Sequence, residues 1–425
     1  MRNVDVMAPC RVLDCNATVE FSMKKPAHLH PRDLHGLVRL AVDATGSIAD
    51  LVEGVHHHIV RPPFLVSSPT PGRTGGIAGL VYASIRGATT VLGGAIDATV
   101  APLVPLFGER ATTPRREAAL AALNGVLGDY LADARNPLAF EMVLRSEGQT
   151  LTLTPRALAA AFPQRSTRVA VLLHGLCMND LQWRRAGHDH GRALARDLDY
   201  TPVYLRYNSG LHISTNGRRF AKLLEDLVGA WPEPIEELVI IGHSMGGLVT
   251  RSALHYASIQ GHAWPARLGR VVFLGTPHHG APLERGGSWV HESLSAVPYV
   301  APFSRLGKIR SAGITDLRHG NLVDEDWEGR DRFARDEDTR RHVALPIDVA
   351  CYAIAATTGT RKSDITGRFL GDGLVRVSSA LGKHRDPKRA LGIEPTRQWV
   401  AYGMHHMDLL SRPEVYERMK AWLAG

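Results

Sequence analysis

The chain has 425 residues, of which 44% are hydrophobic and 22% are charged, which is typical of a globular protein with a buried core. This length exceeds what one domain usually holds, so we expect a large domain with an additional region. The formal net charge is +8, but the basic residues are scattered along the chain. Scattered positive charge without interleaved aromatic residues argues against a nucleic-acid-binding protein.

The cysteines and the amino-terminal sequence bear on the cellular compartment. Cys10, Cys15, Cys177 and Cys351 are too few and too unevenly spaced for a disulfide framework or a zinc site. The amino-terminal sequence lacks the apolar stretch of a secretory signal. The histidine run 56–58 has no cysteine or carboxylate cluster beside it, which favours packing or surface histidines over a metal site. We therefore predict a cytoplasmic protein without a metal or other cofactor.

Residues 1–137 are predicted to form a mainly helical amino-terminal region. Residues 77–108 are rich in Ala, Gly, Val and Leu, but Arg86 and Asp97 interrupt them. A charge at the bilayer centre costs about 2.5 to 3.5 kcal/mol, so this stretch predicts a packed or interfacial helix pair rather than a membrane span. Peripheral membrane contact through this region remains a hypothesis. The following segment, REAALAALNGVLGDYLADARNP, predicts a helix that stops at Asn136 and Pro137.

Residues 138–425 are predicted to form an α/β catalytic domain. The runs LAFEMVLR and QTLTLT, separated by a Glu-Gly turn, predict a hairpin. Further strands are predicted, with helical segments between several of them, at 168–175, 201–207, 235–244, 269–277, 347–357 and 396–403. A last helix is predicted from Pro413 to Leu423. This alternation indicates a mostly parallel sheet flanked by helices on both faces.

A long interruption of the alternation, at about 281–345, predicts a cap over the active site. Its first part, WVHESLSAVPYVAPF, is largely apolar and is expected to face the substrate. Its second part, DEDWEGRDRFARDEDTRRH, is densely charged and is expected to face water. Connections of this length inside a domain are usually functional, although a plain solvated insertion is the alternative.

The motif Gly-His-Ser-Met-Gly at 242–246 lies where a predicted strand ends and a helix begins. A serine on such a sharp turn exposes its hydroxyl, and small flanking residues allow strand and helix to approach closely. The turn also places Ser244 at a helix amino terminus, where developing negative charge is favoured. This context predicts that Ser244 is a nucleophile.

A serine nucleophile needs a base and a group that orients the base, and this fold orders them as serine, acid, histidine. The loop before the final helix offers His406, which we prefer for its spacing to the following leucines, and His405 as the alternative. For the acid we prefer Asp372, between two glycines, over Asp364, whereas Asp348 is at the wrong end of its strand.

The backbone N–H groups of Leu176 and Met245 are predicted to form the oxyanion hole, because such sites use donors after the third strand and after the nucleophile. His174, His243, His278 and His279 are candidates for the pocket wall, and His174 is in addition expected to hold its loop by hydrogen bonds. Cys177 lies beside the site but is not on a sharp turn between a strand and a helix, so we interpret it as a buried structural cysteine.

The motifs LLHGL, GHSMGGLVTR, FLGTPHHGAPLER, GDGLV and HHMDLL occur in this order and resemble those of bacterial lipases and esterases of the α/β-hydrolase superfamily, especially the family similar to GPI-inositol deacylases. The resemblance extends from about residue 138 to the carboxyl terminus. It implies a lipase or carboxylesterase that acts through an acyl-enzyme, with Ser244, Asp372 and His406 in the three catalytic roles.

The predicted function is therefore hydrolysis of a small-molecule or lipid carboxylic ester. An acyltransferase that uses the same acyl-enzyme is one alternative. A binding protein on a hydrolase fold, acting at a membrane surface, is another.

Overall fold

The structure, a computed structural model, describes residues 32–33, 35–43, 113–281, 311–330, 340–360 and 371–425, with single positions between 80 and 94. Its strands are β1 (Val143–Ser146), β2 (Gln149–Thr150), β3 (Arg168–Leu173), β4 (Thr201–Arg206), β5 (Glu237–His243), β6 (Leu268–Leu274), β7 (Ala350–Thr357) and β8 (Gln398–Tyr402). Its main helices are α3 (Pro114–Asp133), α4 (Pro155–Ala161), α5 (His190–Leu198), α6 (Ile213–Ala230), α7 (Met245–Gln260), α10 (Ala312–His319), α12 (Val377–Ala380) and α13 (Pro413–Ala424).

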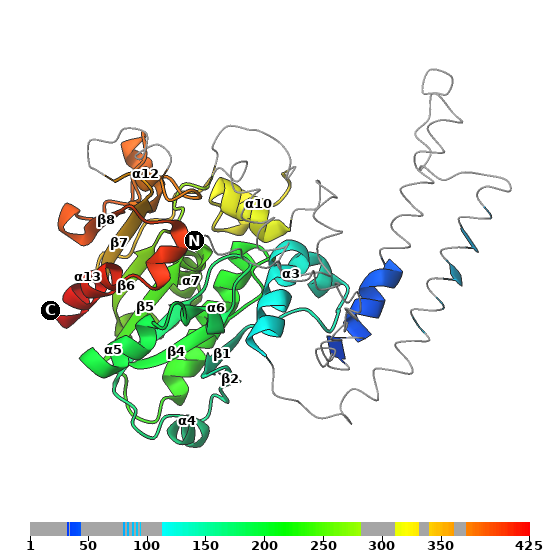
Figure 1. The fold of residues 1–425 in the computed structure, drawn as a ribbon, viewed down its shortest axis with the longest axis horizontal. Coiled ribbons are helices and arrows are strands. Elements are labelled where there is room, and N and C mark those ends of the chain that lie inside the picture. Colours follow the sequence, from blue (N-terminus) through cyan, green and yellow to red (C-terminus); the bar gives the residue numbers. More distant parts are fainter. Residues whose placement is uncertain are drawn as a thin grey trace, which may run out of the picture.

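The eight strands form one sheet in the order β2-β1-β4-β3-β5-β6-β7-β8 (Figure 1). Strand β1 pairs antiparallel with β2 and β4, and all other pairs are parallel. The mostly parallel sheet flanked by helices confirms the predicted α/β-hydrolase fold. Since the parallel strands run the same way, the loops after β3, β5, β6, β7 and β8 meet at one edge, where ligands of open α/β sheets bind.

Helices cover both faces of the sheet, which explains the continuous apolar runs of the central strands. In β3, Val169, Val171 and Leu173 pack in one cluster with apolar residues of α3, α6 and α7. The alternate residues Ala170 and Leu172 pack in a second cluster with residues of α5 and α13. All five are completely buried.

The predicted hairpin exists, but its strands are shorter than the apolar runs that predicted it. The reason lies in helix α3, where the Asn124 side chain donates to the Leu138 carbonyl at 2.8 Å and accepts from the Phe140 N–H at 2.7 Å. These backbone groups are therefore satisfied by a helix rather than by a neighbouring strand. The first residues of the run form a packed connection instead of a strand.

Helix α3 begins and ends where the sequence predicts. Thr113 caps its first turn by accepting from the Arg116 N–H, Pro114 occupies its first position, and the helix stops before Asn136 and Pro137. The helix shares the core cluster of the sheet, to which it contributes Leu123, among others. The division at residue 137 stays a prediction.

Several expectations concern residues outside those the structure describes. They include the histidine run 56–58, the rival acid Asp364 and the apolar part of the cap at 289–303. Most of the stretch 77–108 falls outside as well. Within the described parts, no helix combines the length and the apolar character needed to cross a lipid bilayer.

Candidate active site

Ser244 lies at the elbow between β5 and α7, as the sequence predicts. Its backbone angles are φ 53° and ψ −121°, a conformation that is unfavourable for any residue with a side chain. Ser244 is fixed there because its N–H donates to the Leu274 carbonyl of β6 at 2.8 Å and its carbonyl accepts from the Gly247 N–H at 3.1 Å. Strained backbone held by its surroundings is characteristic of functional sites.

The two glycines of the motif are required by close contacts at this elbow. A methyl group added at Gly242 would lie 2.6 Å from the backbone nitrogen of Gly247, and one at Gly246 would lie 2.6 Å from the Leu173 carbonyl oxygen. Both distances are too short for a real carbon atom. Strand β3, the elbow and the first turn of α7 therefore lie as close together as their backbones allow.

His406 and Asp372 form a buried hydrogen-bonded pair at the same edge of the sheet. The distance between His406 Nδ1 and Asp372 Oδ2 is 2.7 Å, and both residues are buried. The other carboxylate oxygen accepts from the N–H groups of Leu374 and Val375 at 2.9 and 2.8 Å. The carboxylate is thus held by three donors, and it fixes the orientation of the imidazole.

His405, the alternative base, is exposed, whereas its neighbour His406 is buried. The Asp408 side chain accepts from the His405 N–H at 2.8 Å and holds the turn that separates the two side chains. Asp348 is exposed at the amino-terminal end of β7, away from this edge. The geometry therefore groups Ser244, Asp372 and His406 and leaves His405 and Asp348 apart.

Ser244 and His406 line a common cavity whose other walls are largely apolar. Its lining residues are Gly175, Leu176, Met178, His243, Ser244, Pro277, Ala281, Leu317, Leu374, Val375, His406 and Met407. Within the described residues, no hydrogen bond joins the Ser244 hydroxyl to the His406 ring. Such contacts are often long in a site without substrate.

The two predicted oxyanion donors flank this site. Leu176 lies in the loop after β3 and lines the cavity, and Met245 is the first residue of α7. Neither backbone N–H has a hydrogen-bond partner among the residues that the structure describes. Within these parts of the chain, neither N–H is therefore committed to another acceptor.

Of the four histidines proposed for the pocket, His243 lines the cavity, whereas His174, His278 and His279 are not among its lining residues. The buried His243 ring has its Nε2 3.4 Å from the His406 carbonyl oxygen, and burial lowers its pKa well below the usual value. It stays neutral and can donate to that carbonyl, which supports the loop that carries His406.

His174 holds its loop, as expected. Its Nδ1 lies 2.8 Å from the Gly175 carbonyl oxygen, its Nε2 accepts from the Tyr207 N–H at 3.3 Å, and its ring stacks on that of Tyr207. The His278 ring packs edge-on against the Phe273 ring, with 4.7 Å between the ring centroids. Burial raises the pKa of the Cys177 thiol to about 12, which agrees with a structural cysteine.

Sequence reasoning did not identify the apolar wall residues Met178, Leu317, Leu374 and Val375. Three of them lie within three residues of a predicted site residue, so proximity along the chain was an available signal. Leu317 had no such signal, because only the fold brings α10 to the cavity.

Buried histidines make the stability of the chain dependent on pH. Burial lowers the pKa of His174 to about 3 and that of His190 to about 4, from about 6.5 in an unfolded chain. At a pH between the native and the unfolded pKa, the unfolded chain binds protons at these histidines that the native state excludes. The free energy of unfolding is therefore highest above pH ~6.5 and decreases as the pH falls towards 4. For His190 alone we expect a loss of about 2 kcal/mol at pH 5.

The check is urea unfolding at pH 7.5 and pH 5, in the wild type and in a His190→Gln variant. We expect a lower free energy of unfolding at pH 5 and a smaller difference between the two pH values in the variant. An equal pH dependence in both proteins would contradict this role of His190.

No group of three or more histidine, cysteine or carboxylate side chains suited to a metal ion occurs in the parts of the chain that the structure describes. The site instead combines a serine, an aspartate and a histidine, which follow strands β5, β7 and β8. This combination is chemically suited to acyl transfer rather than to metal binding.

Comparison with known proteins identifies one family. Residues 165–345 match the PGAP1-like alpha/beta domain, a segment that includes β3 to β6 and Ser244 but neither Asp372 nor His406. No curated protein matches the chain by sequence.

Three solved structures are similar at low identity. A Bacillus licheniformis lipase in its mature form is 15% identical, with 67% of this chain and 98% of that chain covered and a TM-score of 0.40. A Pyrococcus furiosus esterase is 17% identical, with 61% of this chain and 81% of that chain covered and a TM-score of 0.34. A Staphylococcus hyicus lipase is 13% identical, with 61% of this chain and 92% of that chain covered and a TM-score of 0.31. At these identities and TM-scores, none of their activities is carried over to this chain. The strand order is that of an α/β-hydrolase fold, and within it residues 165–345 are similar to the PGAP1-like alpha/beta domain.

Proposed function

We propose that the chain hydrolyses carboxylic esters through an acyl-enzyme on Ser244. The observation that carries this proposal is the strained Ser244 elbow in the same cavity as His406, whose ring is held by Asp372 at 2.7 Å. A serine hydroxyl is a weak nucleophile until a positioned base removes its proton. The three side chains supply a nucleophile, a base and a group that orients the base.

The first half of the proposed reaction forms the acyl-enzyme. Because the Asp372 carboxylate accepts from Nδ1, the imidazole keeps its proton there and presents an unprotonated Nε2 to the cavity. Nε2 takes the Ser244 proton while the serine oxygen attacks the ester carbonyl carbon. The carbonyl oxygen becomes an oxyanion, and the N–H groups of Leu176 and Met245 stabilise it. His406 then returns the proton to the departing alcohol.

The second half releases the acid. Water enters, loses a proton to His406 and attacks the acyl carbon through the same oxyanion geometry. The C–O bond to Ser244 breaks, the serine oxygen regains the proton, and the carboxylic acid leaves. The predominantly apolar cavity wall favours an apolar acyl group over a charged one.

Burst kinetics with p-nitrophenyl acetate, butyrate and octanoate test this function. We expect a burst of about one p-nitrophenol per chain followed by steady turnover, because the acyl-enzyme accumulates. A competing alcohol separates the two fates of the acyl group: predominant transfer to the alcohol would favour the acyltransferase alternative. Absence of hydrolysis above the buffer rate for all three esters would contradict the proposal.

A further inference from the structure

The loop after β3, residues 174–183, carries the proposed oxyanion donor Leu176, and helix α3 packs directly against it. Gly125 of α3 lies on Cys177: a methyl group added at Gly125 would be 2.2 Å from the Cys177 Sγ and 2.9 Å from its Cα. The Cys177 thiol also points to the Ala122 carbonyl oxygen, 3.8 Å away. Only a glycine allows the helix and the loop to come this close.

Cys177 has a backbone conformation that needs such support. Its φ of 58° is in the left-handed region, which is unfavourable for a residue with a side chain. Its N–H donates to the Ser209 hydroxyl at 3.0 Å, so the residue is held both from α3 and from the loop after β4. Because Cys177 follows Leu176 directly, any change in its backbone angles moves the Leu176 main chain as well.

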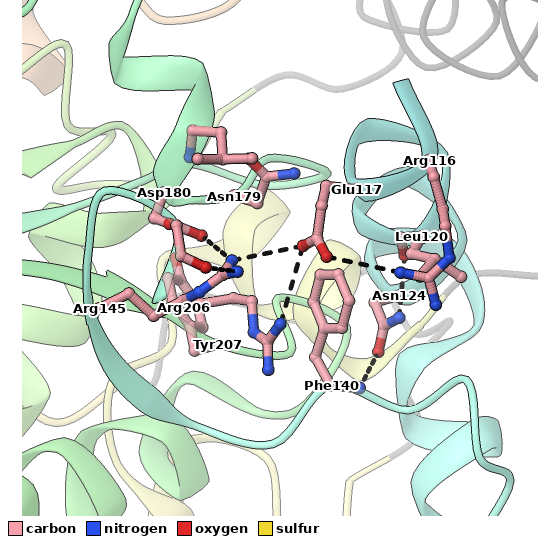
Figure 2. Close-up of polar contacts among 12 residues, drawn as sticks. Arg116, Glu117, Leu120, Asn124, Phe140, Arg145, Asn179, Asp180, Arg206 and Tyr207 are labelled. Atoms are coloured by element: carbon pink, nitrogen blue, oxygen red, sulfur yellow. Dashed lines mark hydrogen bonds and ion pairs between the residues drawn. The ribbon is translucent and has the colours of Figure 1, made fainter. Parts of the chain in front are cut away.

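A buried charge network joins α3 to the far end of the same loop (Figure 2). Arg145 of β1 donates to Asp180 at 2.6 Å and to Glu117 of α3 at 3.4 Å, and all three side chains are at most 4% exposed. Arg206 of β4 adds a fourth charge, 3.7 Å from Glu117. Arg145 thus bridges a carboxylate of the helix and a carboxylate of the loop, so the network ties the end of the loop to the helix.

The same turn of α3 also holds another wall of the cavity. The Gly125 carbonyl accepts from the Ser311 hydroxyl at 2.6 Å, and Asp129 accepts from the Ala312 N–H at 2.9 Å. These contacts anchor the start of α10, which carries the wall residue Leu317. One helix outside the strand–helix alternation thus fixes both the Leu176 side and the Leu317 side of the cavity.

We infer that α3 is a positioning element of the active site, which sets the Leu176 N–H for the oxyanion by contacting Cys177 with Gly125 and by holding, with Glu117, the Arg145 that binds Asp180. The inference rests on the proposed hydrolase function. An oxyanion donor acts mainly in the transition state. Displacing Leu176 should therefore lower kcat and weaken the binding of a tetrahedral adduct, while KM changes little.

The test variant is Gly125→Ala, and the matched control is Gly217→Ala. Gly217 also lies on a helix, α6, and a methyl group there would be 2.1 Å from the Ser252 hydroxyl oxygen, away from the oxyanion loop. Both variants overpack a buried helix contact to a similar degree. The measurements are kcat and KM for p-nitrophenyl butyrate, and the inhibition constant of phenylboronic acid, which forms a tetrahedral adduct with an active-site serine.

For Gly125→Ala we expect kcat to fall about 10- to 100-fold with KM within about twofold, and phenylboronic acid binding to weaken by a similar factor. Adding Cys177→Ala removes the sulfur that meets the new methyl group but leaves the backbone contact at 2.9 Å, so the double variant should regain part of the loss. Gly217→Ala should change neither kcat per folded protein nor the inhibition constant of phenylboronic acid. Equal behaviour of Gly125→Ala and Gly217→Ala would overturn the inference.

Glu117→Gln provides a second test if Gly125→Ala does not fold. It keeps the side-chain size but removes the charge opposite Arg145, so a fall in kcat with weaker phenylboronic acid binding and unchanged KM is expected. Unchanged kcat in this variant would also overturn the inference. Failure of the function itself looks different: the wild type would then show neither Ser244-dependent hydrolysis nor phenylboronic acid binding.

Discussion

Replacing Ser244 by alanine is expected to lower kcat for ester hydrolysis by about 10⁴- to 10⁶-fold, because the acyl-enzyme can no longer form. Alanine is smaller than serine and has the same backbone requirement at φ 53°, so the elbow should persist. KM should change little, since the hydroxyl contributes mainly to the chemical step. Steady-state kinetics with p-nitrophenyl butyrate provide the measurement.

The control for this variant is Ser378→Ala, which alters an exposed serine on the short helix α12. It should retain wild-type kcat, and both variants should unfold at the wild-type temperature. A Ser244→Ala protein that keeps more than about a tenth of the wild-type kcat would exclude Ser244 as the nucleophile, because triad serines contribute far more than tenfold.

The adjacent histidines His405 and His406 offer an internal comparison. His406→Ala is expected to lower kcat by about 10⁴- to 10⁶-fold, because the base and later acid of both half-reactions is lost. His405→Ala should stay within about threefold of the wild type, since surface substitutions away from a site rarely matter. The two variants remove the same chemical group from neighbouring positions of one loop.

The comparison is measured as kcat and kcat/KM over a range of pH, with thermal unfolding as the check on folding. If His405→Ala instead caused the larger loss, the pairing of His406 with Asp372 at 2.7 Å would be structural and not catalytic.

Most of the fold could be predicted because its determinants are local in sequence. The continuous apolar runs of β3 and β5 predict buried strands, and the amphipathic pattern of α6 predicts which face of that helix is buried. The motif around Ser244 predicts where the strand ends and the helix begins. The lengths of β1 and β2 could not be predicted in this way. The late start of β1 depends on the Asn124 side chain, which bonds the backbone of Leu138 and Phe140 from a helix that precedes them in the chain.

The site was predictable to the extent that it follows chain order. The sequence places Ser244, Asp372 and His406 at the carboxyl ends of parallel strands, which must lie at one edge of the sheet. It favours His406 over His405 only through the spacing to the following leucines, because one residue of turn geometry determines which side chain points inward. Their different exposure settles the direction of the side chains.

The role of α3 lay beyond sequence reasoning for a physical reason. Gly125 reads as one more small residue in an alanine-rich helix, and its contact with Cys177 joins positions that only tertiary packing brings together. The structure also shows that α3 contributes to the core cluster of the sheet, which its sequence alone does not indicate. Long-range contacts of this kind leave no periodic pattern in the local sequence.

The most direct test of Ser244 as the nucleophile is reaction of the folded protein with a fluorophosphonate, followed by mass spectrometry of the peptides. We expect one phosphonyl adduct per chain, located on Ser244, absent after prior denaturation and absent from the His406→Ala variant on the same time scale. Phosphonylation requires a serine that a neighbouring base activates. A folded wild-type protein without an adduct, or with the adduct on another residue, would contradict the proposed mechanism.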